Sequence, residues 1–298
     1  MTLHYGLLCR LGTLSTPVEK YHLQVAGGNF KICPPSFEPC KVFRGCHISS
    51  EHMSRELILE DFDQADRRFL PVVVAGINLY ELTHRLTLNN LDAEQLSSNV
   101  FQHLLITASR LDLNDCDMTD EFLQALAKLC SQPVKEIIVG EPNCDDCNFK
   151  SFFHAFPTVE DISFAYVDFP DNWLDEIMEV QQTKLSALYV KGSDENIGKF
   201  DADELLLFLE AQKDNFTLTM HLRSVCSSHE YVKKLETTLK THLIASDVGT
   251  SQGKKTVRVY GFDFAWCYLL PAPKTLKRKV GAKKTSTGKK KGLPAHWH

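Results

Sequence analysis

The closest literal match to a catalytic motif is Gly249-Thr-Ser-Gln-Gly253, which places Ser251 where a hydrolase carries its nucleophile. Such a serine needs a strand before the turn and a helix after it, so that its hydroxyl stands above a sheet. Here a helical pattern precedes the turn, and the alternating segment 254–260 follows it. The segment is also one residue short of a phosphate-binding loop, with no helix behind it. We therefore interpret it as a polar turn.

Cysteine and histidine side chains offer a second kind of chemistry. Cys144-Asp-Asp-Cys147 has the spacing of half a zinc site, but structural zinc needs four ligands, usually from two such pairs. Other conceivable donors are spaced by seven and six residues, unlike a zinc finger: Cys33, Cys40, Cys46 and His47. Ten cysteines in a chain of this length, without a secretory leader, favour reduced and mostly buried thiols. We predict no metal site and no redox pair.

The twelve histidines are scattered, with no HExxH motif and no carboxylate pair placed for general acid–base catalysis. We therefore predict that the protein is not an enzyme and uses no cofactor. No apolar run approaches the length of a membrane span, so we expect no membrane partner.

The elements that would position any functional group repeat along the chain. Seven segments have the pattern apolar-x-apolar of a half-buried strand, with intervals of 29, 25, 26, 25, 26 and 30 residues between their first apolar residues: Leu57, Leu86, Leu111, Ile137, Ile162, Leu188 and Leu218. Helical spacing between them predicts outer helices at 65–79, 94–105, 119–130, 148–156, 171–180 and 201–211. One strand and one helix per 25–30 residues is typical of a stacked repeat, because no single unit can bury its own apolar face.

One repeat carries a family pattern. Arg110 to Leu129 resembles the cysteine-containing leucine-rich repeat, with residues at the family's positions: Leu111, Leu113, Cys116, Met118, Thr119 and Asp120. The resemblance implies an α/β fold, a leucine-rich-repeat-like solenoid with a curved, mostly parallel sheet and outer helices, capped at both ends. Proteins of this kind often look like substrate receptors of cullin ubiquitin ligases, with an F-box before the repeats. Residues 14–25 faintly resemble the opening helix of an F-box; the alternative is a helix that only caps the repeats.

Four regions follow from this pattern. Residues 1–48 form an N-terminal helical or capping segment, 49–215 the repeat array, 216–270 an aromatic-rich C-terminal cap, and 271–298 a tail without regular structure. The chain has a net charge of −5, but residues 274–298 carry nine basic residues and no acid. The remainder has 24 basic and 38 acidic residues, a net charge of −14. This asymmetry argues against nucleic-acid binding by the body itself.

The basic tail has three interpretations: a nuclear-import signal, a contact to nucleic-acid phosphates, or a solubilising extension. The residues in question are Lys277, Arg278, Lys279, Lys283, Lys284, Lys289, Lys290 and Lys291. They predict a nuclear or cytoplasmic protein.

Residues that alternate with the buried leucines point away from the core. The resemblance makes this side the concave face, where we predict partner-binding residues: Glu60, Asn89, Asp112, Asn114, Asp115, Glu141, Tyr166, Tyr189 and Lys191. Acids and amides come first and tyrosines last, which predicts a protein segment that is basic at one end and apolar at the other. An ordinary solvated strand face is the alternative. We predict a non-catalytic recognition scaffold or adaptor, with a ubiquitin-ligase substrate receptor as one form of it. The alternative function is a nuclear regulator that contacts nucleic acid through its tail.

Overall fold

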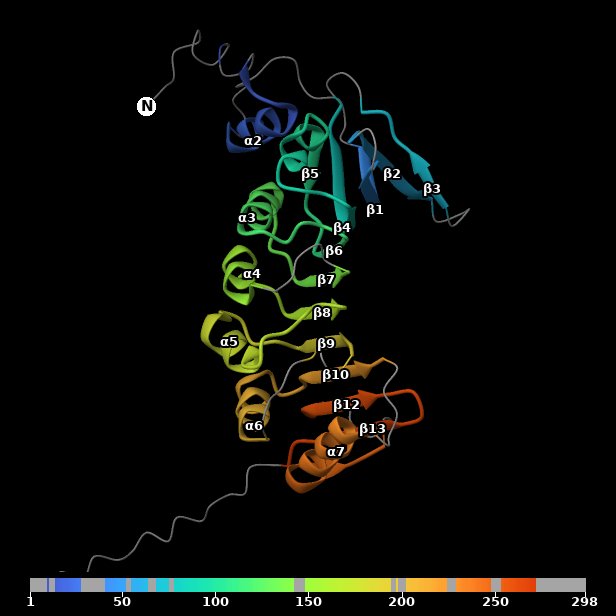
Figure 1. Ribbon diagram of the computed structural model, residues 1–298. Helices are drawn as coiled ribbons and strands as arrows, with labels where there is room; N and C mark the ends of the chain where they lie inside the picture. The colour runs from blue at the N-terminus through green and yellow to red at the C-terminus, as the bar shows by residue number, and fades with distance from the viewer. Residues whose placement is uncertain are drawn as a thin grey trace, which may run out of the picture.

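The computed structural model describes residues 10, 14–27, 41–51, 55–63, 68–74, 78–141, 148–193, 197, 202–223, 229–247 and 253–271. These residues form an α/β fold around one large, mostly parallel sheet of 13 strands (Figure 1). The strands are β1 (Lys41–Ser50), β2 (Leu57–Asp63), β3 (Arg68–Pro71), β4 (Tyr80–Asn89), β5 (Leu104–Ile106), β6 (Arg110–Asn114), β7 (Glu136–Gly140), β8 (Asp161–Ala165), β9 (Ala187–Gly192), β10 (Thr217–Leu222), β11 (Ile244–Ala245), β12 (Thr256–Tyr260) and β13 (Ala265–Leu269).

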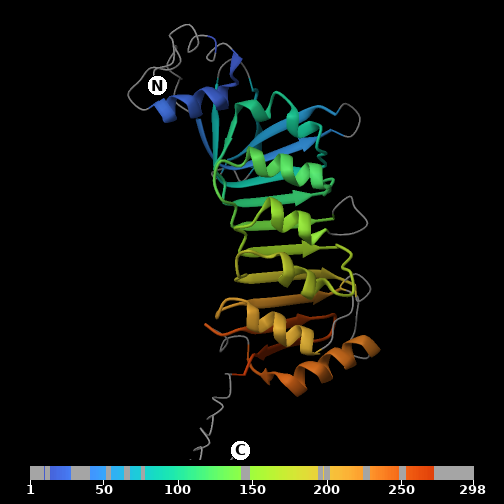
Figure 2. The same ribbon diagram turned by 90° about the vertical axis from the view of Figure 1, so that its left-hand side faces the viewer.

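The described part of the chain also contains six α-helices and two short 3₁₀ turns. They are α2 (Pro17–Gly27), α3 (Asp120–Leu129), α4 (Phe149–Ala155), α5 (Trp173–Val180), α6 (Ala202–Ala211), α7 (Glu230–His242), η1 (Gln95–Ser97) and η2 (Phe101–His103). Helices α3 to α6 lie in chain order along one face of the sheet, each beside the next (Figure 2). Among the described residues no helix covers the opposite face along β6 to β10, and we call that side the open face.

The strand order confirms the prediction that successive segments lie side by side in chain order, for six of the seven segments. Strands β4, β6, β7, β8, β9 and β10 lie side by side in chain order, and each neighbouring pair is parallel. They contain six of the seven predicted segments. Antiparallel strands end the sheet at both edges, with β2 and β3 at one and β13 and β11 at the other.

The seventh segment, at Leu57, breaks the predicted order. Strand β2 runs antiparallel to β1, and β1 separates it from β4. The reason is the short connection: Ser50 pairs directly with Leu57, and a parallel crossover needs a dozen or more residues. The two strands must therefore form a hairpin, which leaves the other edge of β1 for β4.

Two predicted outer helices are wrong. Within 65–79 the structure has strand β3, because Pro71 and the β-branched residues 72–74 disfavour a helix. Within 94–105 it has η1, η2 and the start of β5. Ser97, Ser98 and Asn99 lie in the middle of that segment, and such side chains compete for backbone hydrogen bonds, which shortens helices.

The predicted start of α3 is confirmed, since the Thr119 hydroxyl accepts a hydrogen bond from the Phe122 amide. Helix α2 also begins with a cap: Thr16, directly before Pro17, forms a capping box with Glu19 in the first turn. Helices α3 to α6 bury apolar side chains in one core with the apolar residues of the strands. Helix α4 has only seven residues, and it fills its part of the core with three buried phenylalanines: Phe149, Phe152 and Phe153.

Four successive strands end in the same unusual turn. The residue after each strand has a left-handed backbone: Asn90 (φ 54°), Asp115 (φ 53°), Glu141 (φ 46°) and Tyr166 (φ 59°). Each of these amides donates to the carbonyl of the last or next-to-last residue of the following strand, at 2.7–3.0 Å. Asparagine and aspartate tolerate this conformation, whereas a tyrosine there is strained. The turn is therefore imposed by the sheet, not by the residue that occupies it.

Candidate protein-binding surface

Three rows of residues cross the open face at right angles to the strands, and each row takes one residue from each of seven strands: β4, β6, β7, β8, β9, β10 and β12. The first row holds Arg85, Arg110, Glu136, Asp161, Ala187, Thr217 and Thr256. The middle row holds Thr87, Asp112, Ile138, Ser163, Tyr189, Thr219 and Arg258. The last row holds Asn89, Asn114, Gly140, Ala165, Lys191, His221 and Tyr260.

Asp112 is the centre of an ion-pair network. Its carboxylate accepts from Arg85 and, at 2.9 Å, from Nε of Arg110, whose Nη1 donates to Glu136 at 2.7 Å. The Asp112 side chain is only 4% exposed. Burial lowers the pKa of the Arg110 guanidinium, but the hydrogen bond and charge of Asp112 outweigh it and raise that pKa. Asp112 lies on the predicted face, but its charge is already satisfied within the chain.

A second network lies beside the first row. Glu160 binds Lys135 at 2.8 Å and also Lys213. Hydrogen bonds from these two lysines lower the pKa of Glu160 to about 2. Burial raises the pKa of the neighbouring Asp161, and the carboxylates of Glu136 and Glu160 add to the rise. Both networks tie the starts of neighbouring strands together.

The last row begins with a chain of hydrogen bonds that crosses four strands. His47 Nδ1 lies 2.8 Å from Glu60, and its Nε2 lies 2.6 Å from the Asn89 amide. Asn114 donates to Asn89 Oδ1 at 2.9 Å. A Cβ atom at Gly140 would approach Asn114 Oδ1 to 2.7 Å, so any other residue there would have to displace this amide. Glu60, Asn89 and Asn114 therefore form one polar strip.

A cluster of one aromatic ring and two cations lies further along the same edge; we call Tyr166, Lys191 and Arg223 the Tyr166 cluster. Lys191 Nζ lies 5.0 Å and the Arg223 guanidinium carbon 5.2 Å from the centre of the Tyr166 ring. Arg223 also donates to the Tyr166 hydroxyl. Neither cation forms an ion pair with a carboxylate among the described residues. In contrast, both arginines of the first row form ion pairs with carboxylates.

Next to this cluster, the Tyr189 hydroxyl lies 3.3 Å from His221 Nδ1, and the His221 ring meets Tyr260 edge to face. Burial raises the pKa of the Tyr189 hydroxyl, which keeps it a neutral hydrogen-bond donor. The aromatic end of the surface is therefore also its cationic end.

The other end of the open face carries exposed apolar side chains; we call Ile58, Phe62 and Phe69 the apolar patch. They are 40%, 37% and 45% exposed. Phe69 lies 5.2 Å from Phe62 and 5.2 Å from His47, measured between ring centres. The pairing of β2 with β1 and β3 places them on the same side as Glu60.

The structure thus places Glu60, Asn89, Asp112, Asn114, Tyr189 and Lys191 on one face, with Asp115, Glu141 and Tyr166 in the turns at its edge. Sequence reasoning missed the residues that complete it: His47, Arg85, Arg110, Phe62, Phe69 and Arg223. For the two arginines the signal was present, since each directly precedes a predicted strand and alternates with its leucines.

The other chemical groups do not join this surface. Cys46 and His47 are consecutive in β1, so Cys46 faces the core while His47 faces the open side and they cannot share a metal. Cys33, Cys40, the CxxC pair, Ser251 and the basic tail lie outside the described residues. In the part of the chain that is described, no group of three or more ligand side chains could hold a metal ion. No described helix is long and apolar enough to cross a bilayer.

Burial makes the Cys116 thiol unreactive, which gives a direct test of the fold. Cys116 is 1% exposed, and burial raises the pKa of its thiol to about 12. At pH 8 only about one thiol in ten thousand is then ionised, and the thiolate is the nucleophile. We expect iodoacetamide to label Cys116 at least a hundredfold more slowly in the native protein than in guanidinium, as measured by peptide mass spectrometry. Equal labelling rates in the two states would contradict the burial of this side chain.

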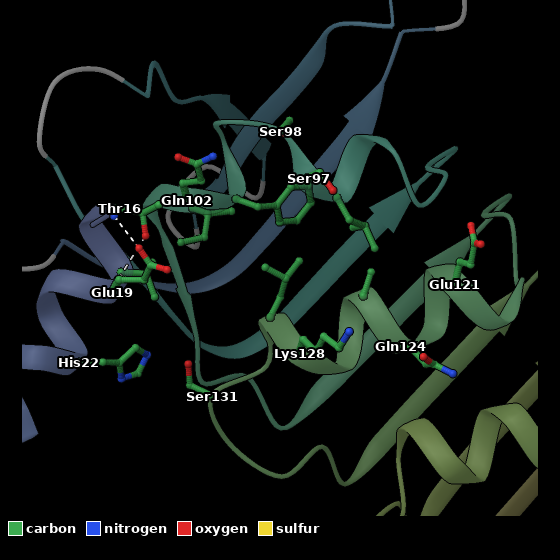
Figure 3. Close-up of a pocket in the computed structure, with 16 residues that line it drawn as sticks. Thr16, Glu19, His22, Ser97, Ser98, Gln102, Glu121, Gln124, Lys128 and Ser131 are labelled. Atoms are coloured by element: carbon green, nitrogen blue, oxygen red, sulfur yellow. Dashed lines mark hydrogen bonds between the residues drawn. The ribbon is translucent and has the colours of Figure 1, made fainter. Parts of the chain in front are cut away.

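A hollow of about 720 Å³ lies on the helix side, between α2, η1, η2 and α3 (Figure 3). Thr16, just before α2, and Glu19 and His22 of α2 line one side, and Gln124 and Lys128 of α3 line another. None of the residues of α2 is buried, so this helix adds a wall to the hollow but little to the core. The hollow contains none of the predicted binding residues.

The open face therefore combines, within one sheet, an apolar patch, a polar strip and a cationic aromatic cluster. Comparison of the chain with models of protein families, with curated proteins and with solved structures finds no match.

Proposed function

We propose that this chain is a non-catalytic recognition scaffold of the leucine-rich-repeat type, in which stacked strand–helix units present the open face to an extended segment of a protein partner. The observation that carries the proposal is that the helices cover one face of β6 to β10, while the other face displays the predicted residues in continuous rows. Polar and aromatic side chains on an exposed sheet face suit a partner better than a core.

The resemblance to F-box adaptors extends this proposal to the substrate receptors of cullin-type ubiquitin ligases. It is supported by α2, which has no buried residue and is flanked by the exposed side chain of Leu14 (82% exposed). In such a receptor α2 would contact the ligase adaptor, and the open face would hold the substrate.

Replacing Ala165 by tryptophan tests the open face. Ala165 is half-buried in the last row between Gly140 and Lys191, so an indole there would obstruct a segment lying across the strands. We expect the proteins captured by quantitative affinity purification to fall about tenfold. Lys150→Trp, on the exposed side of α4, is the matched control and should leave capture unchanged. Equal capture by wild type and Ala165→Trp would exclude the open face as the binding surface.

A further inference from the structure

We propose that the open face recognises an acidic segment of a protein partner, with carboxylate side chains at the Tyr166 cluster and an apolar side chain on the apolar patch. This inference rests on the proposed function and adds the chemistry of the partner. It reverses the polarity that the sequence suggests, which placed a basic partner segment against the acids of the first repeats.

Charge complementarity is the first argument. The predicted acid Asp112 is buried and bound by two arginines, so it offers no free charge to a basic segment. Lys191 and Arg223 form no ion pair with a described carboxylate, and Arg223 is exposed. On a body with an excess of acids, these two cations are a local positive site that attracts carboxylates. The Tyr166 ring holds both in place, which lowers the entropy lost on binding.

The backbone of Tyr166 supplies an independent argument. In the equivalent turns the left-handed position is occupied by Asn90 and Asp115, which adopt it at low cost, and by Glu141, which like Tyr166 adopts it with strain. Strained residues of this kind collect at functional sites. Asparagine would suit the backbone of this turn better than tyrosine, but only the tyrosine ring can hold Lys191 and Arg223.

The distance between the two contact points fixes the length of the segment. Six strand spacings separate Lys191 on β9 from Ile58 of the apolar patch on β2, and strand pairing places both residues in the last row. At about 4.8 Å each, they amount to roughly 29 Å, which an extended chain covers in about nine residues. Between the two points lie Ala165, with only a methyl side chain, and Gly140, with none, which leaves room for a backbone. The amides of Asn114 and Asn89 lie in the same row and can hydrogen-bond to it.

The test uses fluorescein-labelled peptides with two glutamates and a Phe-Leu pair separated by about seven Gly/Ser residues, in both orders, and the full chain in anisotropy titrations. In at least one order we expect binding at least about tenfold tighter than that of the Glu→Gln peptide or of a peptide with a spacer of about two residues. Equal affinities for these peptides, or no binding, would overturn the proposal. So would equally tight binding of a single-stranded oligonucleotide of the same charge.

Variants of the protein separate recognition from stability. Lys191→Gln/Arg223→Gln should weaken peptide binding about tenfold, whereas Lys150→Gln/Lys233→Gln, which removes two exposed helix charges, should change it less than twofold. Tyr166→Asn should weaken binding and leave the unfolding temperature unchanged or higher. Loss of stability without loss of binding would mean that the tyrosine only supports the fold.

The outcomes also distinguish this inference from the proposed function. If Ala165→Trp loses its captured proteins while Lys191→Gln/Arg223→Gln keeps them, the open face binds a partner but not through acids. If neither variant loses them, both proposals are wrong.

Discussion

Replacing Phe164 by alanine should lower the free energy of unfolding by about 3–5 kcal/mol. Phe164 is completely buried in β8, and its ring lies 5.6–5.7 Å from those of Phe149, Phe152 and Phe169. The substitution removes the apolar area, the edge-to-face contacts and the support of the short helix α4 at once. Urea unfolding followed by circular dichroism measures the change.

Phe262→Ala is the control, because Phe262 is 84% exposed and its loss should cost less than about 0.5 kcal/mol. Total stabilities of folded domains are about 5–15 kcal/mol, so the core variant should unfold at a clearly lower temperature. A change below about 1 kcal/mol for Phe164→Ala would contradict an aromatic core between β8 and α4.

The repeat region was predictable because its signal is periodic and local. The alternation around Leu111, Ile137 and Ile162 predicts both the strands and the side that each buries, and parallel order follows from the helix between successive strands. The predicted strand order was wrong at the start of the array, because β2 has the same alternation of apolar and polar residues as the parallel strands. Such a pattern does not say whether a strand runs parallel or antiparallel to its neighbour. For β1 and β2 the short connection makes the pair antiparallel.

Side-chain alternation was also enough to place the candidate residues on one face. It could not say which of the charged residues are already paired within the chain and which remain available to a partner. Asp112 and Lys191 are both charged residues of predicted strands. The first is buried and bound by Arg85 of the neighbouring strand and Arg110 of its own strand, whereas the second lies over the Tyr166 ring. The Asp112–Arg85 and Lys191–Tyr166 contacts each join residues at least 25 positions apart in the chain. Arg223 lies 57 residues from Tyr166, so the cluster emerges only when the strands are stacked.

Asp112→Asn should be the most damaging polar substitution on the open face, with a loss of about 2–3 kcal/mol of folding free energy. Removing one partner of a buried ion pair costs about 3–5 kcal/mol. We expect a smaller loss of folding free energy than this because Arg110 and Arg85 are 27% and 50% exposed, so water can hydrate them when the carboxylate is removed. Asparagine keeps the shape but turns an amide N–H₂ group toward guanidinium donors, so at least one hydrogen bond is lost.

Glu136→Gln is the matched control at the rim of the same network, where the carboxylate is 38% exposed, and it should cost less than about 1 kcal/mol. The Asp112→Asn/Arg110→Gln double variant should be less destabilised than the sum of the two single variants, since the pair is lost only once. Urea unfolding of the four proteins measures this coupling. Additive losses, or equal losses at Asp112 and Glu136, would show that Asp112 is not a structural charge and would return it to the partner-binding surface.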